Sequence, residues 1–137
     1  YRIWRSRERS PFEVRRSLWH PRPLDLAPLA ASTELLRGEH DFRAFTPADT
    51  QHETFVRVVE DARWHERGDA VELEITADSF LRHMVRTLVG TMIQTASGER
   101  PPEAFGRLLE GAERAEAGVT APPQALCLVA VRYADSP

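Results

Sequence analysis

The longest periodic run of apolar positions in this chain lies between Asp78 and Ile93. Its apolar residues are Leu81, Met84, Val85, Leu88, Met92 and Ile93. They recur at intervals of three and four, which is the spacing of one buried face of an α-helix. Asp78 or Ser79 is expected to cap the first turn with a side-chain oxygen. We therefore predict a helix over residues 79–97.

A second face of this predicted helix is polar. Arg82 and His83 lie four and three residues before Arg86, so the three side chains share one side of the helix. Gly90 continues that side and leaves room beside Arg86 for another backbone or a ligand. Arginines on the edge of an otherwise apolar helix either face solvent or contact an anion, and the pattern leaves both readings open.

The remaining patterns predict a sheet and further helices. Alternating and β-branched segments predict strands at residues 1–5, 18–20, 54–64, 70–75 and 126–133. A helix is predicted over residues 26–37, with Asp25 as N-cap and Gly38 just beyond its end, and another after Pro102. The expected fold is α+β, an antiparallel sheet with helices packed on one face.

Composition fits one globular domain. The chain has 137 residues, of which 42% are apolar and 28% charged, and no apolar run approaches the roughly 20 residues of a membrane helix. Cys127 is the only cysteine, which excludes an internal disulfide and fits a reducing cytoplasm. The chain opens at Tyr1 inside a strand-like alternation, which predicts that it is part of a longer protein.

Positive charge is concentrated at the start of the chain. All 18 basic residues are arginines, and residues 1–22 hold seven of them against Glu8 and Glu13. This local balance of +5 leaves −8 for the other 115 residues, given the net charge of −3. Such an asymmetry is typical of a phosphate-binding edge on an otherwise acidic domain.

Other site chemistries have little support. The five histidines form no H-x-H or H-x-x-x-H pair, so no metal site is predicted. Glu39 and Asp41 are close enough in sequence to suggest a glycosidase pair, but capping of a turn is the favoured reading. A dyad of Cys127 with a histidine is the third alternative, although a lone cysteine in an apolar strand is usually buried and inert.

Residues 80–90 read FLRHMVRTLVG and resemble the FxxHMVRxxVG helix of TruA-type tRNA pseudouridine synthases. Three further segments match this family in order. They are residues 38–45 (GxxDFxxF), residues 54–57 (TxxR) and residues 120–133 (TAPxxGLxLxxVxY, with Ala125 at the glycine position). The resemblance implies that residues 1–137 are a single domain, the C-terminal subdomain and one half of the pseudouridine-synthase fold, without the N-terminal catalytic half.

The resemblance also implies roles for individual residues. The catalytic aspartate of the family lies in a GRTD motif that this sequence does not contain. Arg86 matches the arginine that pairs with that aspartate, and Leu126 matches a leucine that packs against the flipped base. The family's catalytic tyrosine lies in a YRY pattern on the opening strand. Residues 1–4 best fit the second tyrosine, and a shift of two residues makes Tyr1 the catalytic one.

For the whole enzyme, the resemblance implies isomerisation of uridine to pseudouridine in the anticodon stem-loop of tRNA, at tRNA positions 38–40. The expected RNA contacts are Arg5, Arg7, Arg9, Arg15, Arg16, Arg57, Arg82 and His83. His83 has an equally favoured structural role, bonding a backbone carbonyl. Expected partners are tRNA, the N-terminal half and a second subunit of a homodimer, in the cytoplasm, with no metal, cofactor or membrane. The alternative is a non-catalytic RNA-binding or dimerisation module of the same fold.

Overall fold

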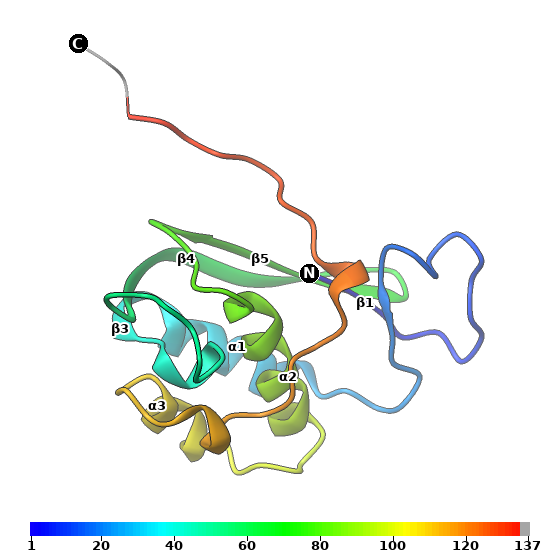
Figure 1. The fold of residues 1–137 in the computed structure, drawn as a ribbon. Coiled ribbons are helices and arrows are strands. Elements are labelled where there is room, and N and C mark those ends of the chain that lie inside the picture. The colour runs from blue at the N-terminus through cyan, green and yellow to red at the C-terminus, as the bar shows by residue number, and fades with distance from the viewer. Residues whose placement is uncertain (135–137) are drawn as a thin grey trace.

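The computed structural model describes residues 1–134, within which five strands form a single sheet (Figure 1). The strands are β1 (Arg2–Trp4), β2 (Leu18–Trp19), β3 (Gly38–Asp41), β4 (Val56–Arg67) and β5 (Ala70–Ala77). They lie in the order β2-β1-β5-β4-β3. Neighbours are antiparallel except β1 and β2, which run parallel. The α+β class is confirmed, but the sheet is mixed and not purely antiparallel as predicted.

The parallel pairing follows from the length of one connection. Residues 5–17 lead from the end of β1 to the start of β2, and parallel neighbours need a crossover of about a dozen residues. β4 and β5 form the predicted hairpin, whose turn is Gly68–Asp69. Its strands are longer than predicted, because residues 65–67 remain paired with β5.

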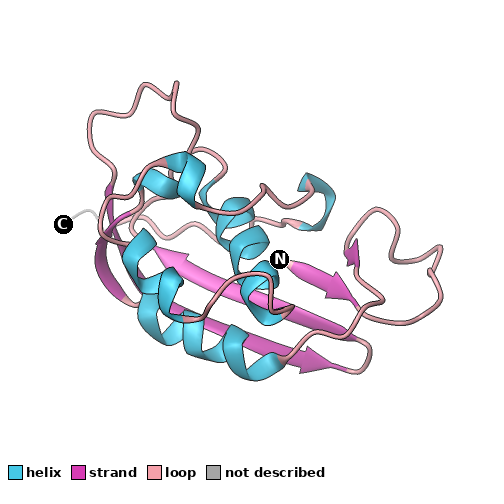
Figure 2. Ribbon diagram, turned by 90° about the horizontal axis from the view of Figure 1, so that it is seen from below, coloured by secondary structure: helices cyan, strands magenta, loops and turns pink. Residues whose placement is uncertain are grey.

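Three α-helices cover one face of the sheet, as predicted (Figures 1 and 2). They are α1 (Leu26–Leu36), α2 (Met84–Ala96) and α3 (Glu103–Leu108). Asp25 is the N-cap of α1, where its carboxylate accepts a hydrogen bond from the backbone N–H of Ala27 at 3.1 Å. α1 packs against α2 and β4, and the buried residues of both helices form one core cluster with those of β4 and β5, which places the core between the helices and the sheet.

The helix predicted over residues 79–97 begins later than expected. The Asp78 carboxylate accepts hydrogen bonds from the backbone N–H groups of Val58 (3.0 Å) and Ser79 (2.7 Å), so it fixes a turn to β4 instead of capping a helix. The chain then reaches α2 through His83, which has a left-handed backbone with φ 62°. Only Arg86 of the predicted polar face therefore lies within the helix.

The strand predicted over residues 126–133 is not formed. After a short 3₁₀ turn at Pro123–Ala125, the chain extends away from the sheet (Figure 1). Leu128 and Tyr133 are exposed, and an ion pair between Arg132 and Glu60 is the salt bridge that joins this segment to β4. A strand needs a neighbour with free backbone groups, and no strand of residues 1–134 pairs with this segment.

Candidate active site

Residues 117–125, which we call the strap, run beside α2 toward the start of β1 (Figure 1). The two backbones approach closely at Gly90, and a side chain of α2 adds a hydrogen bond. A Cβ atom added to Gly90 would lie 1.8 Å from the carbonyl oxygen of Val119, and the Gly118 N–H donates to the Thr91 hydroxyl at 2.9 Å. The space predicted beside Arg86 is therefore filled by the strap backbone.

Arg86 is held where α2 meets the strap. Its Nε–H donates to the Ala121 carbonyl at 2.8 Å, and the Ala121 N–H donates to the Arg86 carbonyl at 3.0 Å. Within residues 1–134, its two Nη groups donate no hydrogen bond and it forms no salt bridge with a carboxylate. The half-buried guanidinium is thus oriented by one nitrogen and retains two for a further acceptor.

Tyr1 lies beside Arg86. Its ring belongs to the core, and its hydroxyl donates to the Pro122 carbonyl at 2.7 Å. Burial raises the pKa of the Tyr1 hydroxyl well above its ordinary value, while the nearby Arg86 guanidinium opposes that rise. The phenol is therefore neutral at pH 7, and the turn from Ala121 to Pro122 binds both predicted side chains through consecutive carbonyls.

Leu126 follows directly after the strap and is 41% exposed. Ala125, which stands where the family has glycine, is buried and does not have a positive φ. The substitution therefore causes no backbone strain. The structure brings Tyr1, Arg86 and the segment before Leu126 to one place, and their catalytic roles stay predictions.

His83 begins α2 in a conformation that few side chains tolerate. Among residues 1–134 it is the one non-glycine residue with positive φ. Burial lowers the pKa of its imidazole, and three guanidinium groups lower it further (Arg86, Arg82 and Arg114). The ring is therefore neutral at pH 7, beside the arginine of the candidate site.

The free energy of unfolding is expected to fall as the pH drops below the ordinary histidine value of about 6.5. Since burial depresses the pKa values of His83 and His20, the unfolded chain binds protons that the folded chain does not. This stability is present above that pH and is lost as the pH falls through the folded pKa values. Thermal melts from pH 7.5 to 5 measure it. His83→Asn, which tolerates positive φ, should weaken the dependence, and an unchanged dependence would contradict the assignment.

The seven arginines among the eight predicted RNA-binding residues separate into two groups by their exposure and contacts. The residues with exposed side chains are Arg7, Arg9, Arg15, Arg16 and Arg82. Of these, Arg9 lies over the Trp19 ring, 4.4 Å from its centroid. The first four extend from the loop of residues 5–17, so the positive charge that the sequence concentrates near its start forms one protruding surface.

Two of the predicted RNA contacts are already bound within the fold. Arg5 donates to the carbonyls of Gly68 (3.0 Å) and Asp69 (3.4 Å) and pairs with Glu66. Arg57 donates to the carbonyls of Thr54 and Val56, at 2.9 and 2.7 Å. These hydrogen bonds stabilise the β4–β5 turn and the start of β4, and they leave fewer donors for phosphate.

Sequence reasoning missed the residues that position Arg86. Arg114 donates to the Gly118 carbonyl at 2.8 Å and to the Thr120 hydroxyl at 3.2 Å, and Thr120 shares a hydrogen bond with Thr87 of α2. These hydrogen bonds fix the strap to Arg114 and to α2. The TAP segment at residues 120–122 was the available signal, but a sequence does not show which carbonyl a guanidinium will reach.

The alternative chemistries gain no support. Asp41 accepts a hydrogen bond from the Arg43 N–H at 3.0 Å, so it caps a turn as favoured. Cys127 is exposed, which corrects the expectation that it is buried. Residues 1–134 contain no group of three potential metal ligands, and none of their helices has the length and apolarity needed to span a bilayer.

This arrangement, a sheet covered on one face by helices with an oriented arginine beside a buried tyrosine, is consistent with one half of a pseudouridine-synthase fold. A model of the tRNA pseudouridine synthase family matches residues 33–134, and the chain belongs to this family.

Curated relatives named tRNA pseudouridine synthase A match nearly the whole chain. The relative from Syntrophotalea carbinolica is 42% identical over 98% of this chain and 53% of its own length. Those from Myxococcus xanthus and Geotalea uraniireducens are 40% and 38% identical, over 100% and 97% of this chain and 52% and 54% of their own lengths. The chain therefore spans about half the length of the relatives it matches.

Proposed function

We propose that the complete polypeptide containing this chain is a tRNA pseudouridine synthase that isomerises uridine in the anticodon stem-loop, at tRNA positions 38–40. The reaction breaks the bond between N1 of uracil and C1′ of ribose, rotates the base and joins C5 to C1′. The hydrogen on C5 leaves as a proton. N1, freed from C1′, takes up one proton from solvent in exchange, so uridine and pseudouridine are isomers and the reaction needs no second substrate.

One observation carries the proposal. The Arg86 guanidinium is oriented through Nε and keeps both Nη groups free of partners within residues 1–134. A carboxylate supplied by the N-terminal half would complete a bidentate pair, which would favour its ionised form and fix its direction. Leu126, being partly exposed beside this position, would cover the flipped base and exclude water.

The proposed assembly is a cytoplasmic homodimer that holds tRNA across both subunits. The free, exposed Cys127 fits a reducing compartment. The Arg-rich loop over residues 5–17 supplies phosphate contacts whose binding free energy would offset the cost of base flipping, a few kcal/mol by general estimate.

Tritium release tests the function directly. The complete polypeptide is incubated with a tRNA transcript whose uridines carry tritium at C5, because forming pseudouridine transfers that tritium to water. The expected result is one or more equivalents of tritium per tRNA, and none from a variant of the GRTD aspartate. If the gene encodes no such aspartate and no tritium is released, the non-catalytic RNA-binding module is the correct reading.

Replacing Arg7 and Arg15 together by glutamine is expected to weaken tRNA binding and to flatten its salt dependence. Removing one arginine–phosphate pair should reduce the slope of log K against log salt by about 0.7–0.9. The matched control is Arg107→Gln, an exposed arginine of α3 remote from the loop (Figure 1). Anisotropy titrations at several salt concentrations measure the slope, and equal slopes in the double variant and wild type would contradict the phosphate role.

A further inference from the structure

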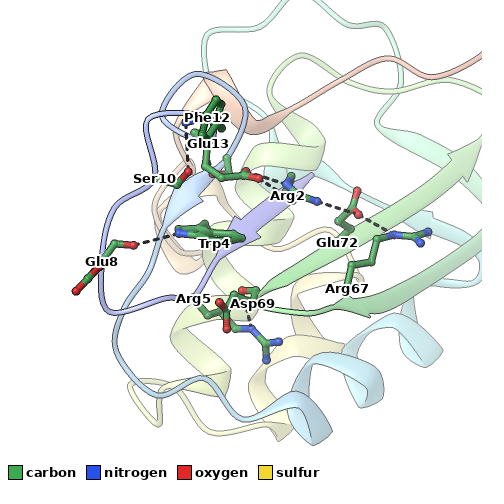
Figure 3. Close-up of polar contacts among 11 residues, drawn as sticks. Arg2, Trp4, Arg5, Glu8, Ser10, Phe12, Glu13, Arg67, Asp69 and Glu72 are labelled. Carbon is green, nitrogen blue, oxygen red and sulfur yellow. Dashed lines mark hydrogen bonds and ion pairs between the residues drawn. The ribbon is translucent and has the colours of Figure 1, made fainter.

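The loop over residues 5–17 is held by hydrogen bonds and an ion pair to residues of the sheet (Figure 3). The Trp4 indole N–H donates to the Glu8 carbonyl at 3.2 Å, and the Trp19 indole N–H donates to the Ser6 carbonyl at 2.9 Å. Both indoles therefore hold the first part of the loop, at Ser6 and Glu8. A connection of this length without such hydrogen bonds would sample many conformations.

An ion pair at Glu13 anchors the second half of the loop. Glu13 accepts two hydrogen bonds from Arg2, at 2.7 and 2.9 Å, and Arg2 also reaches Glu72 at 3.2 Å. Glu72 in turn pairs with Arg67 at 2.8 Å, so the network ties the loop to β1, β4 and β5 (Figure 3). The Arg2 guanidinium lowers the pKa of the Glu13 carboxyl, which keeps this anchor charged at pH 7.

The anchored loop presents one large apolar side chain to solvent. The Phe12 N–H donates to the Ser10 hydroxyl at 3.2 Å, and the phenyl ring is 85% exposed at the turn (Figure 3). Val14, two residues further along the loop, is also exposed. A fixed loop that holds an aromatic ring in water presents a surface suited to a planar partner.

The charged residues of the loop indicate what kind of molecule Phe12 would contact. Arg7, Arg15 and Arg16 are exposed in the same loop, where Glu8 is an exposed carboxylate and the charge of Glu13 is neutralised by Arg2. A loop that exposes both an aromatic ring and three guanidinium groups matches single-stranded nucleic acid, which offers flat bases and regularly spaced phosphates.

The loop is also connected to the candidate active site. A cavity of about 180 Å³ separates it from the start of β2, and Gln124 of the strap lines that cavity. The Gln124 side-chain N–H donates to the Ser17 carbonyl at 3.4 Å. RNA bound along the loop would therefore lie next to the strap that orients Arg86.

We infer that Phe12 stacks on an unpaired nucleobase of the bound RNA, flanked by phosphate contacts from Arg7, Arg15 and Arg16. The inference rests on the proposed function, since it assumes that the loop faces tRNA, and it adds a residue that positions the substrate. Because the phenyl ring is exposed, its replacement leaves the fold intact, and thermal midpoints of the variants should equal that of wild type.

Affinity for a tRNA transcript, measured by anisotropy with the complete polypeptide, tests the inference. Phe12→Ala should weaken binding about 5- to 150-fold, the range expected when one base loses its stacking partner. Phe12→Trp should restore it, whereas Phe12→Leu, which keeps apolar bulk without a ring face, should not. The salt slope should stay that of wild type in all three variants, because every arginine that meets a phosphate is retained.

Four outcomes would overturn the inference. Phe12→Ala binding tRNA as tightly as wild type would reject stacking while leaving the proposed function intact. Rescue by leucine as complete as rescue by tryptophan would show a merely apolar contact. A lower oligomeric mass of Phe12→Ala with unchanged tRNA affinity would place the ring in a subunit interface. If the wild-type polypeptide itself does not bind tRNA, the proposed function fails together with this inference.

Discussion

Gly90→Ala is expected to destabilise the chain by about 3 kcal/mol or more, in the upper range for overpacking of a core. The added Cβ would lie 1.8 Å from the Val119 carbonyl oxygen and 2.9 Å from its carbon, so either α2 or the strap must move. The carbonyl carbon and oxygen of Val119 are backbone atoms, so they cannot move aside by a side-chain rotation. Moving the strap would also break the hydrogen bond between Arg86 and Ala121.

The sign of the change in stability distinguishes overpacking against the strap from the effect of helix propensity. Helix propensity alone predicts that alanine at a mid-helix glycine stabilises by about 0.5–1 kcal/mol. Gly106 of α3 is the matched control, because a Cβ there would meet the Leu35 side chain at an ordinary 3.9 Å. Urea unfolding should therefore show Gly106→Ala at or above wild-type stability and Gly90→Ala well below it. A Gly90→Ala chain as stable as wild type would mean that the strap does not lie against α2.

Elements with local signals could be predicted from the sequence. Asp25 and Gly38 mark the two ends of α1 because capping and a left-handed residue are local requirements, and Gly38 has φ 101°. The hairpin could be predicted since its alternation continues on both sides of Gly68. In each of these cases the residues that decide the structure are neighbours along the chain.

Elements whose structure depends on residues distant along the chain could not be predicted from the sequence. Asp78 looks like a helix cap, but its carboxylate is engaged by Val58, twenty positions earlier. Residues 126–133 alternate like a strand, yet alternation does not name the strand that will pair with them. A strand at residues 18–20 was predicted, but a run this short does not indicate that it will pair with β1 in parallel.

In the candidate site, too, some features could be predicted from the sequence and others could not. Arg86, Tyr1 and Leu126 were named by resemblance to family motifs, whereas the physical pattern indicated no more than an arginine on a helix edge. What orients Arg86 and Tyr1 is backbone, namely the carbonyls of Ala121 and Pro122. Every residue carries a carbonyl, so no residue type in the sequence marks these two as acceptors.

Arg86→Ala in the complete polypeptide is expected to reduce kcat for pseudouridine formation by roughly 100- to 5,000-fold. Removing one partner of a desolvated ion pair typically costs about 3–5 kcal/mol, because the remaining carboxylate loses both its compensating charge and its fixed direction. Arg86→Lys should recover only part of the rate. A lysine keeps the charge, but it cannot bind Ala121 with one nitrogen while presenting two more in a plane.

Stability provides the control for this experiment. Arg86 makes one side-chain hydrogen bond to the strap, so its removal should lower the free energy of unfolding by about 1 kcal/mol, far less than the catalytic effect. The KM for tRNA distinguishes pairing with a catalytic carboxylate from a phosphate contact, since the first affects kcat and the second raises KM. Wild-type kcat in Arg86→Ala, or a raised KM with kcat unchanged, would remove Arg86 from the chemical step and leave it as the residue that holds the strap on α2.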